Sequence, residues 1–190
     1  MPASAKHNTL VLLFLCSFLL PLPAVAGAFA AAIKYAYLTL NDGEYLVSAE
    51  IEYKLSPKAA EALKNGVPLY WAVNIRLQRQ RSFWWNETIV EKKLRFRIQY
   101  QALLNIYKIH NEDTGHSDNF STLAAALDAL STIRYIPLLN RSDLLHEESY
   151  VAGIRVIFDR ELLPLPLRPL SYINPQWYLS STWYLWNLTN

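Results

Sequence analysis

Five side chains that could bind a metal ion lie close together in the middle of the chain. They are His110, Glu112, Asp113, His116 and Asp118, and imidazole and carboxylate groups are ligands for several transition metals. The stretch "EDTGHSDN" has the composition of a polar loop between a strand and a helix, so neither histidine is held on regular structure that would fix its geometry. We therefore interpret this cluster as a solvated turn and predict no metal site.

The sequence carries no other signature of catalysis. It has no G-x-S-x-G motif, no H-E-x-x-H motif and no glycine-rich phosphate loop. Its one cysteine, Cys16, lies in the N-terminal apolar segment, so the rest of the chain has no thiol for catalysis, disulfides or metal binding. The carboxylates are scattered, without a pair that we can place at catalytic spacing. We predict a protein that is not an enzyme and that uses no cofactor.

The stretch "RQRSFWWNE", from Arg79 to Glu87, interleaves basic and aromatic side chains. Such a pattern can bind nucleic acid, a membrane surface or a protein partner, and it can also be the ordinary end of a β-hairpin. The candidate partner-contact residues are Arg79, Arg81, Phe83, Trp84 and Trp85.

The N-terminal residues have the layout of a secretory signal. Lys6 and His7 precede an apolar run, Leu10 to Leu22, and Ala24 and Ala26 have the A-x-A spacing of a cleavage site. We predict a signal peptide over residues 1–26, a single β-rich domain over residues 27–190 and a periplasmic location. An uncleaved inner-membrane anchor is the alternative.

The charge of the exported chain is close to zero. Loss of Lys6 reduces the 18 basic side chains to 17, against 16 acidic ones. A nearly neutral protein has no general electrostatic attraction for nucleic acid, so we predict no nucleic-acid partner.

Alternating apolar and polar residues predict several half-buried antiparallel strands. The clearest is "YLVSAEIEYKL", which follows "IKYAYLTL" through a hairpin turn at Asn41 to Gly43. Further strands are predicted in "LYWAVNIRLQR", "EKKLRFRIQY", "NIYKIH", "YVAGIRVIFDR" and the aromatic "WYLSSTWYLW".

Two short helices are expected among these strands. One begins at Ser56-Pro57 and ends at Asn65-Gly66, and the other begins near Ser121, continues through Arg134 and ends at Pro137. The proline-rich "LLPLPLRPL" predicts an extended crossover. The fold class is therefore mainly β with two short α-helices, arranged as an antiparallel β-sandwich or open barrel. The helices and the crossover do not fit the short-turn meander of an outer-membrane barrel.

The strands that flank "RQRSFWWNE" predict a long hairpin. Paired residues of an antiparallel ladder share a face, and a turn centred on Trp85-Asn86 satisfies this condition. The expected pairs are Leu77 with Leu94, Ile75 with Phe96 and Val73 with Ile98. In this register Arg76 lies near Arg95, which sits beside Arg97. We expect these arginines to pair with acids across the sheet, such as Glu50 or Glu52 if that strand is adjacent.

Six motifs occur in a fixed order along the chain. They are "LSPKAAEALKNGVPL", "RQRSFWW", "YQALLNIYKI", "FSTLAAALDAL", "LPLPLRP" and "WYLSSTWYLW". In order and spacing the chain resembles, from Ile33 to Trp186, the proteobacterial family called domain of unknown function 4390. The resemblance implies an exported, periplasmic protein whose gene neighbours a membrane sensor kinase system. It assigns no catalytic residues.

Two functions are compatible with these features. The first is a non-enzymatic accessory module that binds another protein of the bacterial envelope, with a link to a membrane sensor kinase. The second is a carrier of a small apolar ligand or lipid, suggested by aromatic side chains expected on inward faces. These are Trp71, Tyr100, Trp177 and Trp183, which would otherwise fill the core. The sequence leaves the oligomeric state open.

Overall fold

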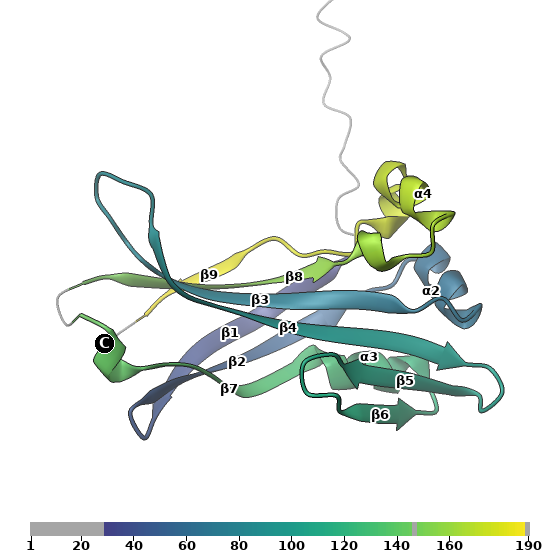
Figure 1. The fold of residues 1–190 in the computed structure, drawn as a ribbon, viewed down its shortest axis with the longest axis horizontal. Coiled ribbons are helices and arrows are strands. Elements are labelled where there is room, and N and C mark those ends of the chain that lie inside the picture. The colour runs from purple at the N-terminus through teal and green to yellow at the C-terminus, as the bar shows by residue number, and fades with distance from the viewer. Residues whose placement is uncertain (1–28, 146–147, 189–190) are drawn as a thin grey trace, which may run out of the picture.

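The computed structural model describes residues 29–145 and 148–188, which form two antiparallel β-sheets packed face to face (Figure 1). One sheet has the strand order β1-β2-β7 and the other the order β6-β5-β4-β3-β8-β9. The predicted β-sandwich is confirmed, and the two sheets do not close into a barrel. The predicted signal peptide lies outside the described residues.

The strands occupy half of the fold and the helices are short. The strands are β1 (Ala31–Asn41), β2 (Glu44–Tyr53), β3 (Leu69–Arg79), β4 (Glu87–Gln101), β5 (Ile106–Asn111), β6 (Ser117–Phe120), β7 (Thr132–Asn140), β8 (Tyr150–Phe158) and β9 (Tyr184–Asn187). The α-helices are α2 (Pro57–Lys64), α3 (Leu123–Ser131) and α4 (Leu167–Ile173), and the 3-10 turns are η1 (Arg141–Asp143), η2 (Arg160–Leu162) and η3 (Pro175–Trp177).

The core lies between the two sheets and follows the predicted alternation. Every second side chain of β2, β3 and β8 points inward and is removed from water, which is the main stabilising contribution to such a fold. Side chains with no exposed surface include Val47, Ile51, Val73, Ile75, Leu77, Ile154 and Val156. At one end the ring of Trp71 packs 5.3 Å from Phe158 and 5.6 Å from Tyr53, measured between ring centroids. The sequence allowed Trp71 and Trp177 either to line a ligand site or to fill the core, and they fill the core.

The hairpin turn and the helix start that were predicted before β3 are both present. Asp42 and Gly43 have φ angles of 47° and 83°, so they make the tight turn between β1 and β2. Helix α2 begins after Ser56, whose side chain accepts a hydrogen bond from the backbone N–H of Ala59. This bond satisfies one of the donors that a helix N-terminus leaves free.

The β3–β4 hairpin is present, but its predicted register is wrong by four residues. Leu77 pairs with Val90 and not with Leu94. The apolar alternation of β4 is interrupted by Lys92, which occupies an inward position and donates a hydrogen bond of 2.8 Å to the backbone oxygen of Pro137. A long lysine stem can pack on apolar surface while its ammonium reaches a polar partner. Strand β4 therefore continues past Lys92, where its alternation of apolar and polar residues is interrupted.

The end of this hairpin also differs from the expected turn at Trp85-Asn86. A β-bulge lies between Leu77 and Gln78, and the last pair of the ladder is Arg79 with Glu87. A bulge adds one residue to one strand, so the even loop length that the alternation required no longer applies. Residues 80–86 form the loop.

Arg95 and Arg97 pair with acids, as predicted, but not with Glu50 or Glu52. Arg95 pairs with Asp113, and Arg97 pairs with Glu112, both from the turn after β5. Glu50 lies in the other sheet, where it pairs with Lys34. The wrong register also placed Arg76 near Arg95, whereas Arg76 lies opposite Glu91.

The second predicted helix is shorter than expected. Helix α3 is capped by Thr122, and the chain then becomes strand β7, which contains Arg134 and Pro137. Pro137 fits there because β7 is at the edge of the three-stranded sheet, where a missing N–H is tolerated. The predicted polar loop after β5 is also shorter, because Ser117–Phe120 pairs with β5 as strand β6.

The C-terminal part contains a third helix where an extended crossover was predicted. Pro166 precedes α4 and Pro169 lies in its first turn, where the backbone N–H has no intrahelical partner to lose. The final aromatic stretch forms a strand only at β9. The preceding residues bind β8 through backbone and side chain, since the N–H of Val156 donates to Ser181 Oγ and the N–H of Ser181 donates to the backbone oxygen of Val156, both at 2.8 Å.

Candidate functional site

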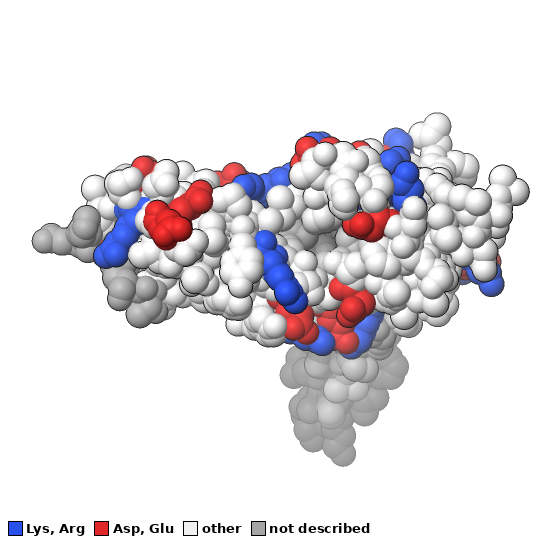
Figure 2. Space-filling model, turned by 90° about the horizontal axis from the view of Figure 1, so that it is seen from below, with Lys and Arg blue, Asp and Glu red and all other residues white. Residues whose placement is uncertain are grey.

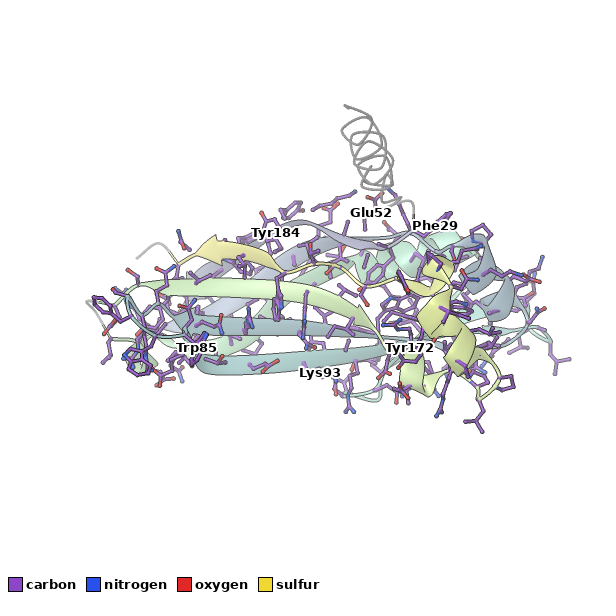
Figure 3. The ribbon with its side chains drawn as sticks, turned by 90° about the horizontal axis from the view of Figure 1, so that it is seen from above. Phe29, Glu52, Trp85, Lys93, Tyr172 and Tyr184 are labelled. Carbon is purple, nitrogen blue, oxygen red and sulfur yellow. The ribbon has the colours of Figure 1, made fainter. Side chains whose placement is uncertain are left out.

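The loop between β3 and β4 carries the most exposed aromatic side chains of the described chain. Phe83, Trp84 and Trp85 are 94%, 74% and 89% exposed. The loop projects beyond the body of the sandwich (Figure 1), and Trp85 lies at one extremity of the molecule (Figure 3). We call residues 82–85 the aromatic tip. Its side chains line a shallow hollow by themselves, without any residue of the sandwich.

The base of the aromatic tip is held by ion pairs and hydrogen bonds. Arg79 donates to Glu87 Oε2 at 2.5 Å, and Arg81 donates to the same oxygen. Both hydrogen bonds hold the pKa of the Glu87 carboxyl below its ordinary value, and the bond from Arg79 has the larger effect. The backbone N–H of Gln80 donates to the backbone oxygen of Ser149 at 2.8 Å, which ties the hairpin to the segment before β8.

The five candidate contact residues therefore divide into two groups. The aromatic residues of the tip are largely exposed, whereas Arg79 and Arg81 form the ion-paired base. Burial of an aromatic side chain removes 150–250 Å² from water in general, at roughly 25 cal/mol per Å². A pre-formed tip of this kind can bind a complementary apolar surface without first having to become ordered.

The residues considered for metal binding do not converge on one point. Glu112 and Asp113 are engaged by arginines, His110 Nδ1 lies 2.7 Å from Ser117 Oγ, and His116 Nε2 lies 3.2 Å from Asp118 Oδ1. Among the described residues no three His, Cys, Asp or Glu side chains come close enough to bind one ion. The turn has the ion-paired arrangement expected of a structural loop.

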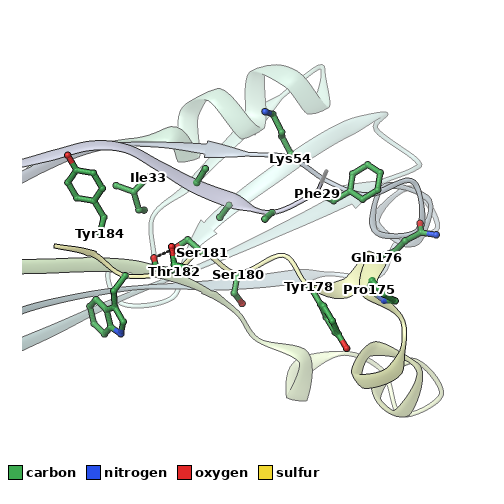
Figure 4. Close-up of a pocket in the computed structure, with 14 residues that line it drawn as sticks. Phe29, Ile33, Lys54, Pro175, Gln176, Tyr178, Ser180, Ser181, Thr182 and Tyr184 are labelled. Atoms are coloured by element: carbon green, nitrogen blue, oxygen red, sulfur yellow. Dashed lines mark hydrogen bonds between the residues drawn. The ribbon is translucent and has the colours of Figure 1, made fainter. Parts of the chain in front are cut away.

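An open groove runs along one edge of the sandwich, between β1 and the segment that precedes β9 (Figure 4). Its volume is about 660 Å³. Apolar side chains of Phe29, Ile33, Tyr178 and Tyr184 line it together with polar ones from Lys54, Gln176 and residues 180–182. An amphipathic surface of this size could accept a small apolar molecule.

A further polar cluster, on the outer face of the six-stranded sheet, was not expected from the sequence. Trp183 was predicted to point inward, but its ring lies under two guanidinium groups on this outer face. The guanidinium carbons of Arg76 and Arg155 lie 3.8 Å and 4.5 Å from the centroid of the Trp183 ring. We call these three residues the Arg–Trp–Arg cluster. No local signal could reveal it, because its members come from three distant segments.

Charged side chains are dispersed over the opposite side of the molecule. Figure 2 shows that Lys and Arg there alternate with Asp and Glu and do not form one continuous basic stripe. This side therefore lacks the electrostatic footprint of a nucleic-acid-binding protein.

These features define a β-sandwich domain with a projecting aromatic hairpin. The family model of a domain of unknown function, DUF4390, matches residues 28–187, and the chain belongs to this family. The resemblance predicted from the six motifs is thus confirmed. No curated protein and no solved structure matches the chain. Within residues 29–145 and 148–188, no helix is long and apolar enough to cross a membrane.

Proposed function

We propose that this chain is a non-enzymatic docking module of the bacterial envelope, exported with cleavage after Ala26. Its aromatic tip binds another envelope protein. The observation that carries the proposal is the exposure of Phe83, Trp84 and Trp85 on a hairpin whose base is fixed by Arg79 and Glu87.

The chemistry of the tip supports a protein partner. Tryptophan is among the residues that contribute most to binding at protein interfaces, where such residues fill pockets of the partner near the centre of the contact. Three adjacent aromatic side chains supply an apolar anchor, and the arginines and Glu87 below them supply a polar rim. A membrane sensor kinase is the first partner to test, and this choice rests on the family resemblance alone.

The experiment compares binding by matched variants of the mature chain, residues 27–190. The wild type, Trp84→Ser/Trp85→Ser and Leu165→Ser/Ile173→Ser are immobilised and exposed to envelope extracts. The third variant is the control, because Leu165 and Ile173 are similarly exposed apolar side chains on a different part of the surface, at 74% and 76%.

A single protein captured by the wild type and the control, but not by the tip variant, supports the proposal. The purified partner must then bind the wild type directly, with at least about ten-fold weaker binding to the tip variant. Equal capture by all three chains, or no capture from either membrane, contradicts it.

The groove between β1 and the C-terminal segment favours a second function, the binding of a small apolar ligand or lipid. Its lining by Phe29, Ile33, Tyr178 and Tyr184 supports this alternative. Native mass spectrometry after gentle extraction tests it: a reproducible lipid adduct that is lost when Ala32→Trp fills the groove supports a carrier. A clean mass of the chain alone counts against it.

A further inference from the structure

The outer face of β3, β4 and β8 gathers cations that have no acid bound to them. Arg76 and Arg155 lie on neighbouring strands, and neither forms an ion pair within the described part of the chain. Lys93 lies opposite Asn74 in the ladder, in the same row as Arg155. Figure 3 looks onto this face and shows Lys93 beside β4. Glu91, opposite Arg76, is the one acid in these two rows.

The guanidinium groups are fixed in place by the Arg–Trp–Arg cluster. Both stack on the ring of Trp183 at cation–π distance. Trp183 itself packs on Gly153, where the absence of a side chain lets the indole approach the sheet. Two positive charges are therefore held against one ring, and among the described residues no carboxylate forms an ion pair with either of them.

Polar atoms inside the cluster also lack partners. Asn74 lies in the ladder between Lys93 and Arg155, is only 7% exposed, and its amide oxygen has no hydrogen-bond partner. The Nε atoms of Arg76 and Arg155 are buried without an acceptor among the described residues. The two arginine side chains as a whole are only half-buried, so their terminal N–H groups are the donors that an anion can meet first, and rotation of the Asn74 amide turns its Nδ2 donor to the position of the unpartnered oxygen.

We infer that the Arg–Trp–Arg cluster, with Asn74 and Lys93, binds a phosphate group. Three cations and one acid leave two net positive charges, which match the charge of about −2 of a phosphate monoester. Guanidinium groups bind phosphate oxygens through paired hydrogen bonds. The group can belong to a soluble phosphate compound or to a lipid headgroup that ends in a phosphate monoester, and both present three terminal oxygens to the cluster. This inference is independent of the aromatic tip.

The test uses the mature chain and two probes. Pyrophosphate represents a soluble ligand with a terminal phosphate, and vesicles of phosphatidylcholine with phosphatidic acid represent a headgroup that ends in a phosphate monoester. Isothermal calorimetry measures the first and vesicle co-sedimentation the second. We expect Arg76→Gln and Arg155→Gln each to weaken binding at least about ten-fold. Arg97→Gln is the matched control, because Arg97 lies on the same face but is paired with Glu112, and it should change binding less than about two-fold.

A gain of binding gives a second measurement. Glu91→Gln removes the acid opposite Arg76, so it should tighten binding about three-fold. Two-dimensional NMR of the unmodified chain covers the case in which a glutamine variant fails to fold: pyrophosphate or short-chain phosphatidic acid should shift the signals of Asn74, Gly153 and the Trp183 indole.

The outcomes distinguish a soluble phosphate ligand from a lipid headgroup, and they can also reject the proposed phosphate site. Binding of pyrophosphate that depends on Arg76 and Arg155 supports a soluble ligand, and binding to vesicles alone with the same dependence supports a lipid headgroup. Absence of saturable binding in both arms overturns the inference. Binding that Arg97→Gln weakens as much as Arg76→Gln also overturns it.

Discussion

Trp183 packs directly against Gly153, so that a methyl group at Gly153 would lie 3.2 Å from Cε3 of the indole and 2.7 Å from Cδ2 of Leu185. Leu185 is half-exposed and can rotate away. Trp183 cannot move as easily, because it lies against Arg76 and Arg155. The contact between these two residues thus sets the position of the cluster on the sheet.

Gly153→Ala should therefore lower the free energy of unfolding by about 1 kcal/mol, through overpacking against the indole. Urea unfolding measures the change. Addition of Leu185→Ala tests the origin of the effect, because it removes one of the two close contacts and leaves the other. If the double variant regains the whole loss, Leu185 and not Trp183 is the obstacle.

The aromatic tip should be nearly irrelevant to stability. Replacement of Trp84 and Trp85 by serine should change the free energy of unfolding by less than about 0.5 kcal/mol for each residue, since neither packs on the sandwich. Trp71→Ala, which removes a buried indole, should cost about 3–5 kcal/mol. Thermal unfolding of the three chains provides the comparison. A large loss in the tip variant would falsify the description of the tip as free of packing contacts.

Removal of one buried hydroxyl should stabilise the chain. The hydroxyl of Tyr53 is buried without a hydrogen-bond partner among the described residues, and burial raises the pKa of Tyr53. Tyr53→Phe should raise the free energy of unfolding by about 1 kcal/mol, because an unsatisfied buried polar group is lost.

Tyr100→Phe is the matched control, and it should change the free energy of unfolding in the opposite direction. The Tyr100 hydroxyl donates to Asn105 Oδ1 at 2.7 Å, and loss of this bond should lower the free energy of unfolding by up to about 1 kcal/mol. The two phenylalanine variants should therefore bracket the wild type in urea. Equal effects of the two would show that the hydroxyl of Tyr53 does find a partner in solution.

The base of the aromatic tip should depend on pH. The pKa of Glu87 is lowered by its hydrogen bonds from Arg79 and Arg81, so the ionised carboxylate stabilises the folded hairpin. This contribution is fully present above the ordinary glutamate pKa, and it is lost as the pH falls through the lowered value. NMR titration of the Glu87 carboxyl carbon should show the lowered pKa, and Arg81→Gln should move it towards the ordinary one. Titration of Glu87 at the ordinary value in the wild type is the contrary result.

The sequence predicted the strands better than their pairing. Alternation identifies which face of a strand is apolar, but a shift by an even number of residues preserves the face. Leu77 could therefore pair with Val90 or Leu94 on pattern alone. The register error arose at Lys92. A lysine at an inward position interrupts the apolar pattern of β4, although the strand continues and the ammonium donates to the backbone oxygen of Pro137.

Two prolines led to wrong predictions of secondary structure. The sequence predicts a helix end at Pro137, but this residue lies in the edge strand β7. It predicts an extended crossover through Pro169, but this residue lies in the first turn of α4. Pro137 is tolerated because β7 has no strand on its outer side, which the local sequence does not reveal, and Pro169 is tolerated because the helix begins just before it.

The two sites differ in how far the sequence could reveal them. The aromatic tip is one continuous stretch, so its composition was sufficient to select it. The Arg–Trp–Arg cluster depends on the pairing of β3 with β8 and on the path of the chain before β9. A period-2 pattern with aromatic residues on both faces could not show that Trp183 lies outside the core.

Strand β8 has a consequence for the order of events during synthesis. It pairs with β3 across a long separation, with Leu77 opposite Ala152, which lies 75 positions later. Pairing of such distant segments slows folding. A nascent chain that ends before Tyr150 leaves the apolar edge of β3 uncovered, and an uncovered edge pairs readily with other chains. We therefore expect aggregation to be most favourable while β3 and β4 are available and β8 is not, and a chaperone that shields β3 at that stage would protect the chain most.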